Sequence, residues 1–447
     1  MRHLLEKEAH HSGRRIAVIG AGVAGLSAAW LLSRHHHVTL FEKSSWLGGH
    51  AHTVEVECPE GPVPVDTGFI VFNERNYPNF TAMLEHLGVP AIDADMSLGV
   101  SVGDGRIEYS SRPRGLFGQK SNLLRPRFWG MIRDILGFYA HARGLDHGAV
   151  DGLSLGEFLE RERYSDALVD EHVLPMCAAI WSTSPREIRD YPMRSFLRFF
   201  ASHGLLQVTG RTQWRTVGGG SHAYVAALLR AMPTVTLRPG ARRISRSGGL
   251  PMVEDASGRS EVFTDIVIAA HADEALGLLA DASADERRVL GAIRYTPNVA
   301  VLHDDPALMP KRKAVWASWN YIGSDDAGPD RPLCVSYWMN YLQSLPTRRQ
   351  LFVTLNPIRE IAPGRTIQTF EYTHPLFDGP ALKAQDELWR LQGAHNTWFC
   401  GSYFGYGFHE DALQSGLAVA EALGAPAPWA AQPGRIARAP EAALAAP

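Results

Sequence analysis

The sequence predicts an α/β fold that joins a parallel-sheet domain to a mixed helical and antiparallel-sheet domain. Three observations support this prediction. A strand, a glycine turn, a helix and a second strand follow one another from residue 14 to residue 42. The stretch 76–213 has apolar residues mainly at helical spacing, and the stretch 287–389 is rich in alternating strand patterns. A chain of 447 residues is also long enough for two or three subdomains.

The first strand and glycine turn have the pattern of a nucleotide-binding unit. Residues 16–19 are apolar on both faces, as in a buried parallel strand. Gly20 permits a tight turn, Gly22 lets the backbone approach a pyrophosphate, and Gly25 lets the next helix pack on the sheet. The helix expected over 23–34 would direct its N-terminal amides at the phosphates. This arrangement is typical of a Rossmann-type dinucleotide site.

The second strand, expected over 37–41, places Glu42 at its end. Glu42 lies 22 residues after Gly20, close to the roughly 20 expected for an acid that binds a ribose hydroxyl. A second glycine turn follows at Gly48, Gly49 and His50. A nicotinamide enzyme has no need of such a turn, whereas the longer FAD needs a second close backbone approach. The sequence therefore predicts FAD rather than NAD.

Three segments resemble the flavin amine oxidase, phytoene desaturase and protoporphyrinogen oxidase superfamily of FAD-dependent oxidoreductases. They are residues 14–69, 214–232 and 397–423, in the order found in that family. The stretch FGYGFHEDALQSG (404–416) is similar to a bacterial subgroup of predicted NAD/FAD-binding proteins, some encoded near cyclopropane-fatty-acyl-synthase-like genes. The FAD contacts expected from the motifs and the resemblance are Gly20, Gly22, Ala24, Gly25, Glu42, Lys43, Gly48, Gly49, His50, Thr67, Gly68, Arg243, Ile244, Gly401, Ser402, Glu410, Asp411 and Ala412.

The chain departs from the family pattern at two of these contacts. His50 stands where the family usually has Arg, and Ser402 stands where it usually has Asp. A neutral His50 would contact phosphate only weakly. The ribityl contact would then fall to Ser402, Glu410 or backbone amides.

The resemblance implies that the domains are interleaved, because the three flavin segments are far apart in the chain. The expected Rossmann-type FAD-binding domain comprises 14–75, 214–286 and 390–424. The helical insertion 76–213 and the strand-rich insertion 287–389 would form the substrate domain. The Ala/Pro-rich residues 425–447 are expected to be disordered.

The substrate is expected to be hydrophobic, because the strand-rich insertion is aromatic. Some of its aromatic residues should face a chamber and others the core: Trp316, Trp319, Tyr321, Tyr337, Trp338 and Tyr341. Desaturation or oxidation of an acyl or isoprenoid chain is the first hypothesis. A flavin amine oxidase and a flavin-binding redox sensor without turnover are the alternatives. Tyr406 and His409 are the candidate catalytic residues, although hydride transfer does not require a base.

Composition excludes several other classes. A net charge of −3 argues against nucleic-acid binding. Four scattered cysteines suit a reducing compartment, and we expect neither a metal site nor a membrane span. Without an apolar leader before residue 14, a cytoplasmic location is expected, with contact to a membrane surface left open. The basic run 311–313 is either a solvated loop or a site for an acidic group, and the electron acceptor is not indicated.

Overall fold

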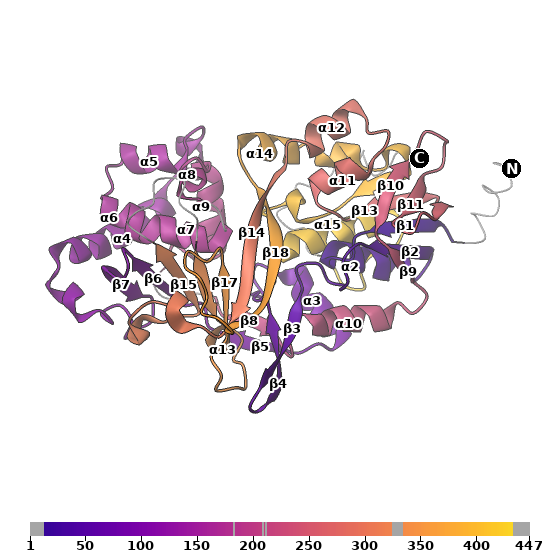
Figure 1. Cartoon of the computed structure of the whole chain (residues 1–447). Helices are drawn as coiled ribbons and strands as arrows, with labels where there is room; N and C mark the ends of the chain where they lie inside the picture. Colours follow the sequence, from indigo (N-terminus) through magenta and orange to yellow (C-terminus); the bar gives the residue numbers. More distant parts are fainter. Residues whose placement is uncertain (1–12, 182–183, 208–209, 211, 324–333, 432–447) are drawn as a thin grey trace.

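Two sheets organise the molecule (Figure 1). The computed structural model describes residues 13–181, 184–207, 210, 212–323 and 334–431. The first sheet has five parallel strands in the order β19-β13-β1-β2-β9. Its strands are β1 (Arg15–Ile19), β2 (His37–Glu42), β9 (Thr236–Pro239), β13 (Asp265–Ile268) and β19 (Thr397–Phe399). These strands come from the three ranges 14–75, 214–286 and 390–424, and the predicted α/β fold class is confirmed.

The parallel sheet is buried on both faces, as the apolar run of β1 predicts. Ile16 and Val18 pack on one side, and Ala17 and Ile19 pack on the other. The first side is covered by α2 (Val23–Leu32), α10 (His222–Ala231) and α15 (His409–Ala422). The second side is covered by a small sheet and two helices: β10 (Ala241–Ser245), β11 (Met252–Asp255), β12 (Ser260–Val262), α11 (Ala272–Leu278) and α12 (Ala284–Leu290).

The second sheet has seven strands in the order β18-β14-β17-β16-β15-β6-β7. Its pairs are antiparallel except β15 with β6, which is parallel. The strands are β6 (Leu98–Val102), β7 (Ile107–Ser110), β14 (Arg294–His303), β15 (Trp319–Gly323), β16 (Val335–Trp338), β17 (Phe352–Leu355) and β18 (Thr366–Leu376). The long pair β14 and β18 runs between the two halves of the molecule (Figure 1).

The region 76–213 is mainly helical, with strands that the sequence analysis did not predict. β6 and β7 join the second sheet, and β5 (Ala91–Ala94) pairs with β8 (Trp214–Val217). The helices are α3 (Pro78–Leu87), α4 (Pro126–Gly144), α5 (Leu155–Arg161), α6 (Asp166–Leu168), α7 (Leu174–Trp181), α8 (Pro185–Arg189) and α9 (Met193–Ser202). α3 packs against α10 and α15 of the parallel-sheet half, so it extends the core of that half.

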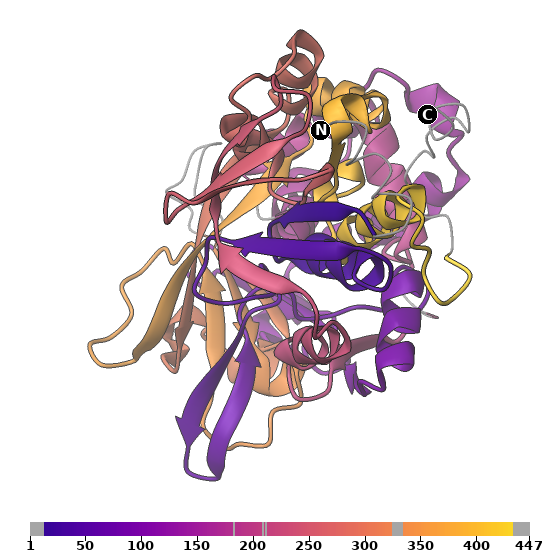
Figure 2. The ribbon, with the colours of Figure 1, turned by 90° about the vertical axis from the view of Figure 1, so that its right-hand side faces the viewer.

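Other elements connect or close these two halves. The hairpin of β3 (Thr53–Cys58) and β4 (Gly61–Asp66) projects from the lower side of the molecule in Figures 1 and 2. Short helices α13 (Met339–Leu342) and α14 (Gly379–Gln385) follow strands of the second half. Of the tail 425–447, residues 432–447 lie outside the described residues; before them, Trp429 stacks on Trp30 at 6.1 Å, and Ala425 is buried. An indole gives this segment apolar area that its Ala/Pro composition obscured.

Candidate active site

The first glycine turn shows which glycine leaves room for a ligand. A Cβ at Gly20 would lie 2.6 Å from the Ala269 carbonyl oxygen, and a Cβ at Gly25 would overlap the Gly20 carbonyl. These two glycines are therefore required by packing. A Cβ at Gly22 would meet no atom within 4 Å. Gly22 thus borders open space directly before α2.

The N-terminus of α2 opens onto that space. Gly22 is its N-cap, no side chain caps the helix, and its first turn has no acidic residue. The first amides of a helix lack intrahelical partners, and the helix dipole favours an anion there. Ala24 and Gly25 lie in this first turn. An uncapped, ten-residue helix beside a glycine with open space fits a phosphate group.

Glu42 lies beside the same turn, at the carboxyl end of β2. One carboxylate oxygen accepts a hydrogen bond from the Ala21 amide at 2.7 Å, and the other accepts one from the Ser44 amide at 2.7 Å. Each oxygen has a further lone pair for a ligand hydroxyl. Lys43 points elsewhere, because its exposed ammonium pairs with Glu274 of α11.

The second glycine turn is held directly against the first. The Gly48 amide donates to the Ala21 carbonyl at 2.8 Å, and Gly49 has a φ of +59°. A Cβ at Gly49 would lie 3.1 Å from the Gly22 Cα. The two turns predicted from sequence to approach one cofactor are therefore adjacent in space.

The turn at Thr67 and Gly68 packs on the second glycine turn. The Phe69 amide donates to the His50 carbonyl at 2.6 Å, and a Cβ at Gly68 would overlap that carbonyl. The Thr67 hydroxyl lies 2.8 Å from the Tyr372 hydroxyl of β18. This turn thereby links the parallel-sheet half to the long strands of the second sheet.

His50 lies among other aromatic rings at the junction of the two halves. Its ring centroid is 5.2 Å from Tyr372, 5.6 Å from His374 and 6.0 Å from His271. Its buried Nε2 has no hydrogen-bond partner among the described residues. Burial, reinforced by His374 and His271, holds the pKa of His50 well below its usual value, so the ring is neutral at pH 7. An unpartnered nitrogen in this position fits a polar ligand atom.

Asp66 connects three segments around the site, and the sequence analysis did not single it out. Its carboxylate accepts hydrogen bonds from the amide and hydroxyl of Ser221 and from Thr53 and Gln343. Burial raises the pKa of this carboxyl to about 6. Ser221 precedes α10, so Asp66 fixes the glycine turn of the middle segment. A lone Asp in a turn gives no sequence signal of its distant partners.

The C-terminal segment brings its glycine turn and helix to the same junction. The Gly401 amide donates to the Ser415 hydroxyl at 2.8 Å. This hydrogen bond holds the turn that begins at Ser402. The Asp411 carboxylate accepts the amides of Tyr406 at 3.0 Å and Phe408 at 2.9 Å. Asp411 therefore shapes the loop before α15 with its side chain, and Ala412 follows it within the first turn of that helix.

The Glu410 carboxylate is engaged with α3. It accepts hydrogen bonds from the Asn79 amide at 3.0 Å, the Asn79 side chain at 2.9 Å and the Phe80 amide at 2.9 Å. Burial raises the pKa of this carboxyl to about 7. Glu410 thus caps the start of α3 and fastens it to α15.

The two residues considered for catalysis sit in different surroundings. The His409 ring stacks on Phe69 at 3.8 Å, and its Nε2 lies 2.8 Å from the Tyr224 hydroxyl. Burial lowers the pKa of His409 to about 3, so its ring stays neutral. The ring centroid of Tyr406 lies 6.1 Å from that of Phe199 in α9, on the side of the helical region. These contacts give His409 a packing role and place Tyr406 nearer the second half.

Arg243 and Ile244 lie on β10, in the small sheet. The Ile244 side chain is buried, and its carbonyl accepts the Ala280 amide at 2.9 Å. The Arg243 side chain is exposed.

The aromatic residues of the second sheet divide between its two faces. Trp319 and Tyr337 pair across β15 and β16 with centroids 4.8 Å apart, and they pack with Tyr321 in the large core that includes the helical region. Trp316 and Trp338 pack with Phe352 in a separate cluster on the other side. Only the first set lies on the face toward helix α7.

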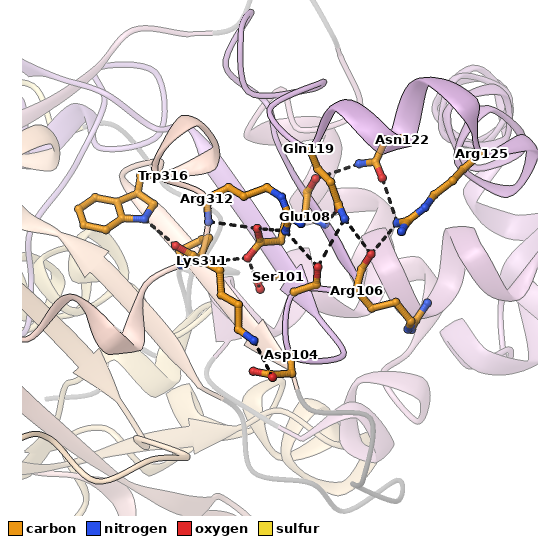
Figure 3. A network of polar contacts seen from close by, with 12 residues as sticks. Ser101, Asp104, Arg106, Glu108, Gln119, Asn122, Arg125, Lys311, Arg312 and Trp316 are labelled. Carbon is orange, nitrogen blue, oxygen red and sulfur yellow. Dashed lines mark hydrogen bonds and ion pairs between the residues drawn. The ribbon is translucent and has the colours of Figure 1, made fainter.

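The basic run at 311–313 has partners within the protein (Figure 3). Lys311 pairs with Asp104 at 2.6 Å, and Arg312 pairs with buried Glu108 at 2.7 Å. The Lys313 ammonium lies 5.6 Å from the centre of the Trp316 ring. The run therefore ties a loop to the β6–β7 hairpin. This role favours the loop over a site for an acidic group.

The described residues contain neither a cluster of metal-ligating side chains nor a helix suited to span a membrane. Within these ranges, no group of three His, Cys, Asp or Glu side chains is arranged to hold a metal ion. No helix in the same part of the chain is long and apolar enough to cross a membrane.

Comparison with known proteins agrees with this geometry. The NAD(P)-binding Rossmann-like domain family matches residues 18–87. A Mycobacterium tuberculosis protein that carries the name of a flavin-containing monoamine oxidase, AofH, is 28% identical over 268 residues, which are 56% of each chain. The carotenoid phi-ring synthase of Streptomyces griseus is 29% identical over 172 residues, 34% of this chain and 32% of that one. The chain thus matches about half or less of these relatives' lengths.

Solved structures share the fold over nearly the whole chain. A CLA-producing fatty acid isomerase from P. acnes superposes with a TM-score of 0.62 and 17% identity, covering 90% of this chain and 97% of that one. The cyclohexylamine oxidase of Brevibacterium oxydans gives a TM-score of 0.64 and 13% identity, covering 92% and 98%. The fold is therefore a Rossmann sheet with an added mixed-sheet domain. Residues 18–87 therefore match the NAD(P)-binding Rossmann-like family, and the chain as a whole shares its fold with structures that include amine oxidases and one titled a putative protoporphyrinogen oxidase.

Proposed function

We propose that the protein is an FAD-dependent oxidoreductase that oxidises a hydrophobic substrate, an acyl or isoprenoid chain. The observation that carries the proposal is the uncapped start of α2, with open space at Gly22 and the second glycine turn packed beside it. Two adjacent backbone approaches suit the long diphosphate and ribityl chain of FAD. Bound FAD would supply the hydride acceptor.

The residues around the junction have separate roles in this proposal. The α2 amides and Gly22 would hold the diphosphate, and Glu42 would hold the adenosine ribose. His50 would donate or accept one hydrogen bond through its unpartnered Nε2. Arg243 or Ile244 would contact adenine through the backbone. The flavin end would be lined by six further expected contacts: Thr67, Gly68, Gly401, Ser402, Asp411 and Ala412.

We further propose the domain division that follows from these roles. The FAD-binding domain would comprise 14–75, 214–286 and 390–424, with α3 added to its core because Glu410 caps that helix. The rest of 76–213 and 287–389 would form the substrate domain.

The substrate side favours an apolar molecule. Phe199 of α9 stacks on Phe408 at 5.2 Å, beside Tyr406. Three carboxylates described above, those of Asp66, Glu410 and Asp411, already accept hydrogen bonds from backbone amides. No free carboxylate is therefore evident among them to pair with a charged substrate. The similarity of 404–416 to the subgroup encoded near cyclopropane-fatty-acyl-synthase-like genes points in the same direction.

An amine oxidase is the second candidate. It is favoured by the similarity to AofH and by Tyr406 and Phe408, which present aromatic rings where an amine substrate could lie.

Acid precipitation of purified protein tests the cofactor. FAD should appear in the supernatant, because the nearest thiol to the C-terminal turn, Cys400, is buried and its pKa is raised to about 12 by burial. Colour that stays with the pellet would show covalent attachment, and colourless protein that takes up no added FAD would refute the proposal.

A further inference from the structure

The segment between Tyr109 and Arg133 has an unusual charge. It contains six basic residues and no acidic one, although the whole chain has a net charge of −3. The six are Arg112, Arg114, Lys120, Arg125, Arg127 and Arg133. Positive charge is thus concentrated on one short stretch at the start of the helical region.

The same stretch and the helix that follows expose large apolar side chains. Leu124 is 87% exposed, Leu136 52%, Leu123 49% and Trp129 47%. They are four of the ten large hydrophobic side chains that are exposed in the described part of the chain. Scattered single residues of this kind are ordinary, but a group within fourteen positions indicates a contact surface.

The amphipathic pattern of α4 explains the exposure. Phe128, Met131 and Phe138 are buried in the core, whereas Trp129, Arg133 and Leu136 share the opposite face at helical spacing. Gly130 and Gly137 lie near that face, and a Cβ at either would meet no atom within 4 Å. In Figure 1, α4 lies in the half of the molecule opposite the parallel sheet.

The turn before α4 is held firmly in place. Residues 120–124 form a short 3-10 helix in which buried Asn122 donates to the Glu108 carbonyl at 3.0 Å, and Gln119 accepts the Glu108 amide at 2.7 Å (Figure 3). The Trp129 indole donates to the Leu123 carbonyl at 3.1 Å. Leu123 and Leu124 are therefore presented to solvent by an ordered turn.

We propose that this face, the 120–136 surface, docks the protein on the surface of a bilayer that contains anionic phospholipid. The surface consists of Lys120, Leu123, Leu124, Trp129, Arg133 and Leu136, whereas Arg127 turns away from it and pairs with Glu171 at 3.2 Å. Leucine and tryptophan side chains insert at the boundary between headgroups and acyl chains, and lysine and arginine attract anionic headgroups. The association is peripheral.

The charge of the surface argues against a second copy of the chain as its partner. A two-fold dimer through this face would place the same patch on both subunits. Lys120 and Arg133 of one copy would then face those of the other, and the carboxylate of Asp134, 3.3 Å from the Arg133 guanidinium, offsets only part of this positive charge. A lipid surface supplies both the negative charge and the apolar layer.

Vesicle flotation with the full-length protein tests the proposal. We expect binding to phosphatidylcholine vesicles that contain phosphatidylglycerol, weak binding to phosphatidylcholine alone, and loss of binding as salt is raised. Leu124→Ser should weaken binding about tenfold, because a largely exposed leucine would no longer be buried in lipid. Lys120→Gln combined with Arg133→Gln should weaken it by about fivefold for each charge removed.

Leu237→Ser is the matched control. Leu237 is 53% exposed, but it lies on β9 at the edge of the parallel sheet. It should leave vesicle binding unchanged, and thermal melting should confirm that every variant is folded. The proposal is overturned if no vesicle binds the wild type, or if Leu124→Ser and Leu237→Ser behave alike. A dimer in solution that Leu124→Ser dissolves, without vesicle binding, would overturn it in favour of self-association.

Discussion

The proposed nucleotide end and the proposed substrate end of the candidate site are built in different ways. At the nucleotide end, neighbouring residues make the geometry: Gly20, Gly22 and Gly25 lie within six positions, and Glu42 follows on the next strand. At the proposed substrate end, Phe199 and Phe408 stack on each other although they come from distant segments of the chain. The difference teaches that a backbone turn made by neighbouring residues can be predicted from the sequence, whereas the shape of a chamber depends on long-range packing.

The largest expected effect separates two glycines of the same turn. Gly22→Val should abolish FAD binding and leave the melting temperature nearly unchanged, because its side chain enters open space. Gly25→Val should prevent folding, because its Cβ would overlap the Gly20 carbonyl. Flavin absorbance per protein and thermal melting measure both. Full flavin content in folded Gly22→Val would contradict the assigned diphosphate position.

The ribose contact should be weaker but measurable. Glu42→Ala removes a charge-assisted hydrogen bond worth about 1.5–3 kcal/mol, roughly ten- to a hundredfold in the FAD dissociation constant. Lys43→Ala is the neighbouring control, since Lys43 pairs with Glu274 at the surface. Titration of apoprotein with FAD compares them. Equal dissociation constants for Glu42→Ala and wild type would show that the ribose lies elsewhere.

The buried Glu410 predicts a pH dependence of stability. Burial raises its pKa from 4.5 to about 7, so the folded state holds a proton that the unfolded state has lost between these pH values. The contribution of Glu410 to the free energy of unfolding should therefore fall by about 3 kcal/mol from pH 4.5 to pH 7. Glu410→Gln keeps an acceptor for the α3 amides and should flatten that part of the profile. Denaturant unfolding across this range tests it, and parallel profiles for the two proteins would contradict it.

The two faces of the second sheet can be compared with one pair of tryptophans. Trp319→Ala and Trp338→Ala should both lower stability, because both side chains pack in apolar clusters. We expect only Trp319→Ala to slow reduction of the flavin by substrate, by about tenfold, since its face is turned toward the helical region. Anaerobic stopped-flow absorbance measures the rates. Equal rates in the two variants would remove this face from the substrate site.

The smallest effect is expected at Tyr406 and His409. Tyr406→Phe and His409→Asn should lower the rate of flavin reduction by less than about tenfold, because oxidation of an unactivated chain offers no acidic proton to a base. A loss on the order of a hundredfold with either variant, in protein that retains FAD, would identify a general base.

The limits of the sequence-based prediction follow the same division. Periodicity and glycine spacing predicted the fold class. They also predicted that the turns at Gly22 and Gly49 approach one cofactor, and the two turns are adjacent in the structure. The same patterns gave no sign that Asp66 joins Thr53, Ser221 and Gln343, because those partners are up to 277 positions away. Nor did strand alternation show which aromatic face meets the helical region, since the covering elements are set by packing.

Reduction of the flavin by candidate substrates tests the central claim most directly. Purified protein with bound FAD would be mixed anaerobically with fatty-acyl and isoprenoid lipids and, in parallel, with primary and secondary amines. A lipid should bleach the flavin rapidly, and the amines should leave its absorbance unchanged. Rapid bleaching by an amine with none by any lipid would contradict the central claim and favour the amine oxidase.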